Sequence, residues 1–392
     1  MEYGIIAKNM LAGLGHSYTW GNLAGKWFTL PTAYMPPGQT SIDYACFVLF
    51  GNTPGAVISI FSINVIFSVL SIFLIAKIAQ ALFNIRRVTL ITLWIVALYP
   101  PFLYSTATFG VTTTVILLQS WILLSSIRFV DSVTKGQRFT KEAVQIGIGF
   151  GLLFLFRGEA PLYAIATILL LLYTCRKQLA LVLPKLVLAT VISIAILAPW
   201  TIRNYVVFDR FVPISSNGGF NFWRGNNALT TGSPWTESGG PLWSTDELWQ
   251  KIEPYLDSGA LFDKMHSSIH SQAATEWIAE HPSSAMMLWV KKALIFWTFD
   301  TNSIMGGTFI YMTMYAITLL LFAIGLFYLF KEKKISFGIR LILTWCIMAT
   351  LVAMVFFPLP RLQVIVIASY FPIMAFGATK IIDRLRRQPT NF

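Results

Sequence analysis

Long apolar runs constrain this chain more than any other feature, because a run of about 17–25 apolar residues crosses the hydrocarbon core of a bilayer as a helix. Reading the 392-residue sequence this way predicts about nine spans. They occupy residues 54–83, 88–105, 109–130, 142–157, 159–175, 179–199, 305–330, 336–357 and 362–382. Only 12% of the residues are charged and the mean hydropathy is +0.66, so we expect most of the chain to fold in a membrane.

A further apolar stretch, residues 33–50, is broken by Pro36, Pro37 and Asp43. Because of these interruptions, we interpret it as a juxtamembrane or re-entrant helix rather than a span. The predicted fold class is therefore an all-α polytopic membrane protein with this extra helix and a small external cap domain that is mainly helical.

A long polar segment divides the predicted spans into two groups. The four expected regions are an external loop with juxtamembrane helices (1–53), a first bundle of about six spans (54–199), an external domain (200–304), and a second bundle of about three spans with a basic tail (305–392). The segment 203–241 is rich in Gly, Asn, Ser and Trp, which is typical of loops. The segment 245–292 predicts two or three helices, because STDELW is typical of a helix start and HSSIHSQAATEWIAEHP is amphipathic.

The basic residues predict the orientation, because cytoplasmic loops carry an excess of Lys and Arg. Basic clusters occur at 86–87, 128–141, 176–185, 331–334 and 384–387, at alternate ends of the spans. All of them face the cytoplasm only if the C-terminus is cytoplasmic and residue 1 lies outside. We therefore expect a multi-pass protein of the plasma (inner) membrane whose active face lies outside the cytoplasm. The clusters account for the net charge of +12, so nucleic acid is not an expected partner.

Charged residues on the predicted outer side lie within a few residues of apolar runs, and they are Glu2, Asp43, Arg157, Glu159, Arg203 and Arg361. Ionisable groups at such depths are costly and suggest a substrate pathway. Arginine suits a phosphate or pyrophosphate, which it binds through paired hydrogen bonds. A carboxylate can deprotonate an acceptor or hold a divalent metal. We expect these side chains to converge on one face.

Each of these residues also has a plain structural interpretation. Arg203 lies four residues after a span and can extend to the interface, and Arg361 can be an interfacial anchor. Arg157 and Glu159 can pair only with each other across a tight turn. Asp43 can be a helix-surface carboxylate that faces water. Glu2, at the start of the chain, can be solvated.

No metal site and no disulfide framework is predicted. His266 and His270 have a spacing that allows metal binding on one helix face, but no third ligand is evident. Cys46, Cys175 and Cys346 lie in or near apolar runs without a CxxC pair, so neither a disulfide framework nor a zinc site is expected.

Several segments of the sequence are similar to one family of membrane enzymes. They are EYGIIAKNMLAGLGHSY (2–18), PTAYMPPG (31–38), ALYPPFLYS (97–105), LFRGEAP (155–161) and PWTIRNYVVFDRFVPISSNGGFNFWRGNN (199–227). Over nearly its whole length the chain resembles the GT-C superfamily of integral-membrane glycosyltransferases. It is most similar to the bacterial glycosyltransferase family 39-like branch, which is related to protein O-mannosyltransferases and lipid A aminoarabinose transferases.

The resemblance implies transfer of a sugar from a polyprenyl-phosphate carrier to a lipid, glycan or protein acceptor on the non-cytoplasmic face. It also implies contact with membrane lipids, and it leaves the cofactor open because only some relatives use a divalent cation. The catalytic candidates are Glu2, Asp43 and Glu159. The substrate-binding candidates are Arg157, Arg203 and Arg361 for the carrier phosphate, together with Tyr34, Asn217 and Asn226. On this interpretation, Arg203→Ala abolishes transfer while the protein still inserts.

The sequence departs from the family at three places. Only Glu2 remains of an acidic region that follows a first span in relatives, PPG continues with Gln39-Thr40 instead of Tyr-Pro, and no acid lies near Thr112. No signal-like apolar region occurs in residues 1–30, so we expect that a first span is missing, rather than that the N-terminus crosses unaided. These departures keep open a non-catalytic GT-C-like protein, a pseudoenzyme or subunit that binds carrier lipid or glycan. A solute transporter is disfavoured, because the sequence shows no repeated halves.

Overall fold

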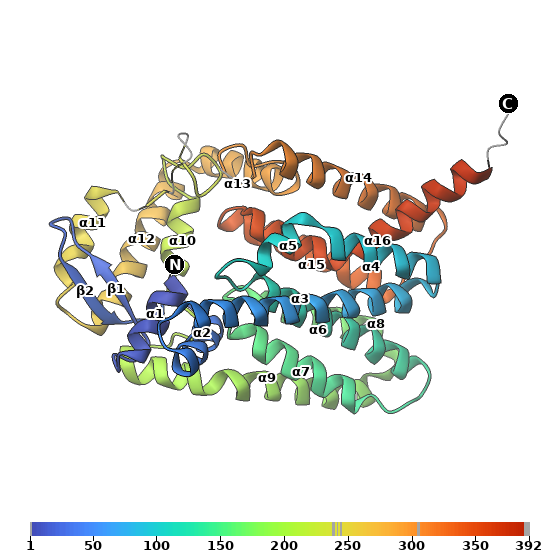
Figure 1. Cartoon of the computed structure of the whole chain (residues 1–392), viewed down its shortest axis with the longest axis horizontal. Helices are drawn as coiled ribbons and strands as arrows, with labels where there is room; N and C mark the ends of the chain where they lie inside the picture. Colours follow the sequence, from blue (N-terminus) through green and yellow to red (C-terminus); the bar gives the residue numbers. More distant parts are fainter. Residues whose placement is uncertain (1, 237–239, 241, 244, 304–305, 388–392) are drawn as a thin grey trace.

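The computed structural model describes residues 2–236, 240, 242–243, 245–303 and 306–387. Figure 1 shows long helices that run along the long axis of the molecule, which we call the bundle, and a smaller group of elements that covers one end of them. We call this smaller group the cap. It consists of β1 (Ser17–Gly21), β2 (Trp27–Pro31), α10 (Gly218–Gly225), α11 (Asp246–Ile252) and α12 (Ala260–Glu280).

The bundle contains the helices that the apolar runs predict. They are α3 (Pro54–Phe83), α4 (Arg86–Leu98), α5 (Pro100–Thr106), α6 (Thr112–Thr134), α7 (Thr140–Phe154), α8 (Ala160–Thr174), α9 (Leu179–Phe208), α14 (Phe309–Lys331), α15 (Phe337–Val355) and α16 (Pro360–Arg387). The predicted all-α polytopic fold is confirmed: six helices of the described chain are long and apolar enough to cross a membrane, or seven if α4 and α5, bent by 54°, form one span. Helices α7 and α8 have 15 residues each, so the expected number of nine spans stays a prediction.

The bundle helices differ in how much of their surface the protein itself covers. In the most apolar window of α6, 83% of the residues are buried, whereas the corresponding value is 28% for α3 and 22% for the span that contains α9. The uncovered faces carry exposed apolar side chains such as Ile66 and Val191. Lipid tails are as apolar as leucine, so such faces are stable in a bilayer. Helix α6 therefore lies inside the bundle, and α3 and α9 lie at its edge.

Small residues allow the bundle helices to approach closely. A Cβ atom on Gly147 of α7 would lie 2.6 Å from the carbonyl oxygen of Ala189 in α9. The Ser193 hydroxyl of α9 also donates to the Gly147 carbonyl over 2.8 Å. A Cβ atom on Gly377 of α16 would likewise lie 2.5 Å from the carbonyl oxygen of Leu321 in α14. Glycine at these positions is therefore required by the helix packing.

The chain begins with a short helix, α1 (Glu2–Leu11), which is followed by an antiparallel hairpin of β1 and β2. The hairpin pairs Ser17 with Pro31 at one end and Gly21 with Trp27 at the other. The sequence analysis does not anticipate this hairpin. Its strands, SYTWG and WFTLP, are short and mix polar with aromatic side chains, so a search for long apolar runs does not detect them.

Helix α2 (Pro37–Phe50) is the helix expected within the stretch 33–50. It begins with Pro37 in its first turn, where the missing N–H of proline costs no helical hydrogen bond. The Gly38 amide donates to the carbonyl of Leu155 over 2.7 Å, at the end of α7. This bond places the start of α2 directly against the turn between α7 and α8.

The remaining helices complete the cap end and join it to the bundle. Helix α11 begins as predicted with an N-cap, because the Thr245 hydroxyl accepts from the Leu248 amide over 3.3 Å. Helices α10 and α12 cross closely: a Cβ atom on Gly219 would overlap the carbonyl of Ser267. Helix α13 (Pro282–Trp297) leads from the cap to the bundle and packs on α15. Short 3-10 helices cover Arg176–Gln178 and Glu253–Tyr255.

Candidate functional site

Six polar side chains from distant parts of the sequence come together where the cap meets the bundle. They are Glu2 and Tyr3 at the start of α1, Arg157 and Glu159 in the turn between α7 and α8, Arg224 in the last turn of α10, and Arg361 in the first turn of α16. We call this group the charged cluster. It contains four of the six charged residues that the sequence analysis expected to converge.

Electrostatic interactions with Tyr3 show that the members of the charged cluster are neighbours. Burial raises the pKa of the Tyr3 hydroxyl, the positive charges of Arg361 and Arg157 oppose that rise, and the two carboxylates of the cluster add to it. Burial lowers the pKa of the Arg224 guanidinium; the nearby Tyr34 raises it, Arg361 lowers it and Glu2 raises it. The site is thus dense in charge, and where its side chains are buried each electrostatic interaction is strengthened.

Arg157 and Glu159 form the ion pair that was expected across the turn. The Arg157 guanidinium contacts the Oε1 atom of Glu159 through two nitrogens, and the two side chains are 15% and 21% exposed. Glu159 is also the N-cap residue of α8, where the helix dipole favours a negative charge. This carboxylate is therefore largely neutralised by the protein itself, and it holds Arg157 in place.

Arg224 is a member of the charged cluster that the sequence analysis missed. Its guanidinium lies over the rings of Phe220, Trp243 and Phe357, at 5.5, 5.9 and 5.2 Å. The Nη2 atom donates to the Pro234 carbonyl over 3.1 Å, but the buried Nε atom has no hydrogen-bond partner. The sequence did offer a signal for Arg224, because this residue lies in the motif WRGNN, inside the segment that carries the family resemblance.

Glu2 and Arg361 are the least satisfied members of the charged cluster. Neither forms an ion pair or side-chain hydrogen bond within the described part of the chain, and Arg361 is exposed to solvent while Glu2 is half-buried. The cluster holds three guanidinium groups and two carboxylates, one of which Arg157 already neutralises. An anion can therefore bind with little competition from the protein.

An apolar pocket extends from the Arg157–Glu159 pair into the bundle. Its walls come from α6, α7, α8, α13, α15 and α16, and apart from the ion pair they are almost entirely apolar, with Gln119 and Tyr163 as the further polar side chains. Typical wall residues are Leu153, Val352 and Ile365. The cavity has a volume of about 20 Å³, room for about one water molecule, so a lipid tail would have to lie against the outer faces of the bundle instead.

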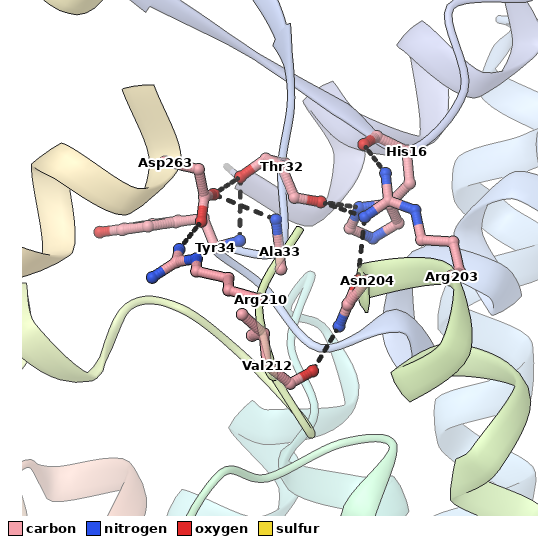
Figure 2. A network of polar contacts seen from close by, with 9 residues as sticks. All are labelled: His16, Thr32, Ala33, Tyr34, Arg203, Asn204, Arg210, Val212 and Asp263. Carbon is pink, nitrogen blue, oxygen red and sulfur yellow. Dashed lines mark hydrogen bonds and ion pairs between the residues drawn. The ribbon is translucent and has the colours of Figure 1, made fainter. Parts of the chain in front are cut away.

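Arg203 lies apart from the charged cluster, in a separate network that Figure 2 shows. Its guanidinium donates to the carbonyl of Thr32 over 3.0 Å and to the carbonyl of His16 over 2.9 Å. It also donates to the side chain of Asn204 over 3.0 Å and lies 5.1 Å over the ring of Trp200. The hydrogen-bond acceptors occupy both terminal nitrogens of Arg203, and the Trp200 ring covers its guanidinium. The geometry of Arg203 therefore gives no support to the expected phosphate contact.

Asp263 of α12 organises the other half of this network. Its carboxylate accepts from the Thr32 hydroxyl over 2.8 Å, from the Ala33 amide over 3.1 Å and from Arg210 over 2.9 Å. We call His16, Thr32, Ala33, Arg203, Asn204, Arg210 and Asp263 the junction network. It ties the end of α9 to the segment after β2 and to α12, and it therefore fixes the cap on the bundle.

Asp43 is also separate from the charged cluster. It is fully buried in α2, and Gln39 donates to its Oδ1 atom over 2.8 Å while Oδ2 has no partner. Burial raises the pKa of Asp43 to about 6, although the bond from Gln39 opposes the rise. The structure brings no arginine to this carboxylate within the described residues. It therefore lacks the neighbours that the other two catalytic candidates share.

The three remaining substrate-binding candidates are held by protein contacts. Asn226 is fully buried, and its amide donates to the carbonyls of Phe222 and Val355 while its oxygen accepts from Trp289 and Lys292. All of its hydrogen-bonding capacity is thus used.

Asn217 contacts Ser215 and Met35, and Tyr34 packs in an aromatic cluster with Trp20 and Phe220. Tyr34 is 8% exposed, but the charges of Glu2 and Arg224 act on its hydroxyl, so it lies at the edge of the charged cluster.

The residues of the charged cluster do not fit a resident divalent cation. No group of three or more His, Cys, Asp or Glu side chains occurs in metal-binding proximity among the described residues. Glu159 is already paired with Arg157, so Glu2 is the one carboxylate of the cluster that is left to bind a metal. His266 and His270 pack among aromatic rings of the cap, and burial lowers the pKa of both imidazoles.

Comparison with protein families gives one match. Residues 36–202 match the family described as dolichyl-phosphate-mannose-protein mannosyltransferase. No curated protein sequence matches the chain.

Comparison with solved structures finds the same fold in an archaeal enzyme. The chain is similar to the oligosaccharyltransferase AglB from Archaeoglobus fulgidus in complex with an inhibitory peptide and a dolichol-phosphate. The TM-score is 0.57 at 14% identity, and the alignment covers 98% of this chain and 46% of AglB. The same enzyme tethered with an acceptor peptide gives a TM-score of 0.55 at 15% identity, with coverage of 99% and 46%. This chain thus spans less than half the length of AglB.

A looser alignment is found with ArnT from Cupriavidus metallidurans bound to undecaprenyl phosphate. Its TM-score is 0.43 at 14% identity, with coverage of 97% of this chain and 72% of that one, which is too low to support an inference.

Proposed function

We propose that this chain is a membrane glycosyltransferase of the GT-C superfamily and that it transfers a sugar from a polyprenyl-phosphate carrier to a lipid, glycan or protein acceptor. The observation that carries this proposal is the charged cluster where the cap meets the apolar bundle. A polyprenyl phosphate has an anionic head and an apolar tail, and this site offers cations at the end of a bundle whose outer helices expose apolar faces. The dolichol-phosphate in the AglB complex is a ligand of the same chemical kind.

In the proposed site, Arg361 and Arg224 hold the carrier phosphate. Arg361 is exposed and has no ion-pair partner among the described residues, and Arg224 has a buried Nε atom without a hydrogen bond. Arg157 is oriented by Glu159 and adds positive charge at the inner edge of the cluster. Charge developing on the leaving phosphate would then be stabilised by groups that are already in position.

Glu2 is the proposed general base. The acceptor hydroxyl oxygen forms a bond to the anomeric carbon, and the bond between that carbon and the carrier phosphate oxygen breaks. The acceptor proton passes to the Glu2 carboxylate, and the carrier leaves as the polyprenyl phosphate anion. Glu159 is less suited to this role because Arg157 occupies one of its oxygens. The base is thus a carboxylate without a protein partner.

We further propose that the charged cluster and the cap face the non-cytoplasmic side of the plasma membrane, with the C-terminus in the cytoplasm. The basic clusters of the sequence support this orientation, because residues 128–141 and 331–334 lie in connections at the end of the bundle that is opposite the cap.

Binding of undecaprenyl phosphate to the purified chain in detergent tests the site. Arg361→Gln should weaken binding roughly tenfold or more, the value expected for loss of a hydrogen bond to a charged group. Lys26→Gln is the matched control, because Lys26 is an exposed cation in the turn of the cap hairpin. Equal affinity of Arg361→Gln and the control would contradict the proposed phosphate site.

Turnover separates an enzyme from a non-catalytic carrier-binding protein. In a proteoliposome assay with a polyprenyl-phosphate sugar and cell-envelope acceptors, Glu2→Gln should lose transfer while keeping its affinity for undecaprenyl phosphate. Tight carrier binding by the unmodified chain, without transfer to any acceptor, would support the pseudoenzyme or subunit.

A further inference from the structure

A small basic pocket lies at the end of the bundle that is opposite the cap. It is formed where α8 ends, the 3-10 helix Arg176–Gln178 turns the chain, and α15 begins. Its lining residues are Tyr173, Thr174, Arg176, Lys177 and Arg340. The pocket is far from the charged cluster along the long axis of the molecule (Figure 1), and it plays no part in the proposed transfer.

The pocket carries a concentrated positive charge that the protein does not neutralise. Three of its five lining residues are cationic and none is acidic. Some basic residues at this end are paired, namely Arg87 with Asp383 and both Lys334 and Lys380 with Glu332. Within the described residues, Arg176, Lys177 and Arg340 form no ion pair. Three unpaired cations around one hollow repel each other, and an anion between them would remove that repulsion.

Two buried polar atoms of the lining residues also lack hydrogen-bond partners. The Nε atom of Arg340 and the Oγ1 atom of Thr174 are both buried without a hydrogen bond. Such atoms are rare in folded proteins and indicate a missing partner. A guanidinium Nε–H and a hydroxyl are both suitable donors to a phosphate oxygen. The Arg176 guanidinium is held 4.9 Å over the ring of Tyr173, which limits its freedom before any ligand binds.

The surface beside the pocket is apolar and faces outward. Tyr173 is 60% exposed, and Leu169, one turn before it on α8, is also 60% exposed. Leu179 and Leu181 at the start of α9 are exposed as well. Acyl chains can lie along these faces while a phosphate occupies the pocket, whereas a soluble phosphate would use only the charged part of the site.

From these observations we propose that the pocket binds the phosphate of an anionic phospholipid from the leaflet at this end of the bundle. Basic pockets between membrane helices bind anionic lipid head groups, because each nearby cation attracts the phosphate. The bound lipid would join the connection between α8 and α9 to the start of α15. The site is independent of glycosyl transfer and of the orientation proposed above.

Native mass spectrometry of the delipidated full chain in detergent tests this proposal, with phosphatidylglycerol and phosphatidylcholine as the probes. The unmodified chain should bind one phosphatidylglycerol molecule at least roughly tenfold more tightly than phosphatidylcholine. Arg340→Gln and the double variant Arg176→Gln with Lys177→Gln should each weaken phosphatidylglycerol binding roughly tenfold, because each removes at least one charged donor. Arg138→Gln is the matched control: it removes an exposed cation of the same end, outside the pocket, and should leave binding unchanged.

A second set of measurements distinguishes the lipid from a soluble anion and from misfolding. The midpoint temperature of thermal unfolding of the unmodified chain should rise when phosphatidylglycerol is added. It should stay unchanged with inorganic phosphate at millimolar concentration. Equal stabilisation by inorganic phosphate would overturn the lipid assignment. Arg176 and Lys177 are exposed, so their double variant should fold normally even if Arg340→Gln does not. Undiminished phosphatidylglycerol binding by a folded double variant would overturn the site.

Discussion

The charged cluster and the junction network contain the same kinds of residue, yet the structure gives them different tasks. In the junction network, Arg203 donates to two backbone carbonyls and Arg210 pairs with Asp263. In the charged cluster, Arg361 and Glu2 have no such partner among the described residues. Proximity to the membrane is common to both groups, so it does not identify a binding arginine. A binding arginine is identified instead by the absence of a protein acceptor for its guanidinium.

The junction network should be essential for folding and not for chemistry, and Asp263→Ala gives the largest expected effect. It leaves the Thr32 hydroxyl and the Ala33 amide without an acceptor and Arg210 without its counter-charge. Because Arg210 is 25% exposed, water can compensate part of the loss, and we expect a decrease of about 3 kcal/mol in the free energy of unfolding. Denaturant unfolding in detergent measures it. A loss below about 0.5 kcal/mol would mean that the network does not hold the cap.

The charged cluster should behave in the opposite way. Arg361→Gln removes a cation that contacts no protein acceptor in the described structure, so unfolding should be unchanged while transfer falls roughly 100-fold. Steady-state transfer rates and unfolding curves on the same preparation check both parts. Unchanged transfer would remove Arg361 from the proposed phosphate site, and a large stability loss would assign it a structural role instead.

Arg203→Ala tests the comparison most directly, because the sequence and the structure predict different results. The sequence analysis expects abolished transfer. From the structure we expect a loss of about 2 kcal/mol in stability, since the carbonyls of His16 and Thr32 lose their charged donor. Transfer per folded molecule should then stay within a few-fold of the unmodified chain. Abolished transfer by fully folded Arg203→Ala would restore the sequence-based assignment.

Lys292 of α13 is a buried cation of a third kind, and its effect is expected in the pH dependence of stability. It is fully buried, its acceptors in the described part of the chain are the Asn226 oxygen and the Met354 carbonyl, and burial lowers the pKa of Lys292 to about 7. Its ordinary value of 10.5 applies to the unfolded chain, which therefore binds more protons between pH 7 and 10.5. The free energy of unfolding should rise with pH across this window.

Replacing this cation by a neutral side chain of similar length checks the interpretation. Lys292→Met should flatten the rise in stability between pH 7 and 10.5, measured by urea unfolding at several pH values. A profile identical to that of the unmodified chain would show that Lys292 does not titrate in this range.

Much of the fold was predictable because the bilayer imposes a length and a composition on each span. The runs 54–83 and 109–130 correspond to α3 and α6 within a few residues, and the helix start at Thr245 followed from its acidic first turn. The β1–β2 hairpin was not predictable in this way, since its strands have five residues each.

The candidate site was predicted only in part, and the reason is geometric. Residues near span ends on one side of a membrane share a depth, so the sequence could place Glu2 and Arg361 at one level. It could not tell which of them face each other around the bundle. Asp43 lies at the same level but bonds to Gln39 one turn earlier in its own helix, and Arg203 turns toward the segment after β2.

The apolar runs were enough to predict a helical membrane protein, and the motifs were enough to suggest a resemblance to the GT-C superfamily, because run length and motif wording are local properties of the chain. The sequence also indicated the depth at which charged residues lie. The packing of the folded chain was needed to show that Arg224 joins the cluster, that Arg203 supports the cap, and that three cations near α8 form no ion pair among the described residues. Partners such as these are separated by up to hundreds of residues, and whether a charge is satisfied depends on the packing of helices that no local pattern specifies.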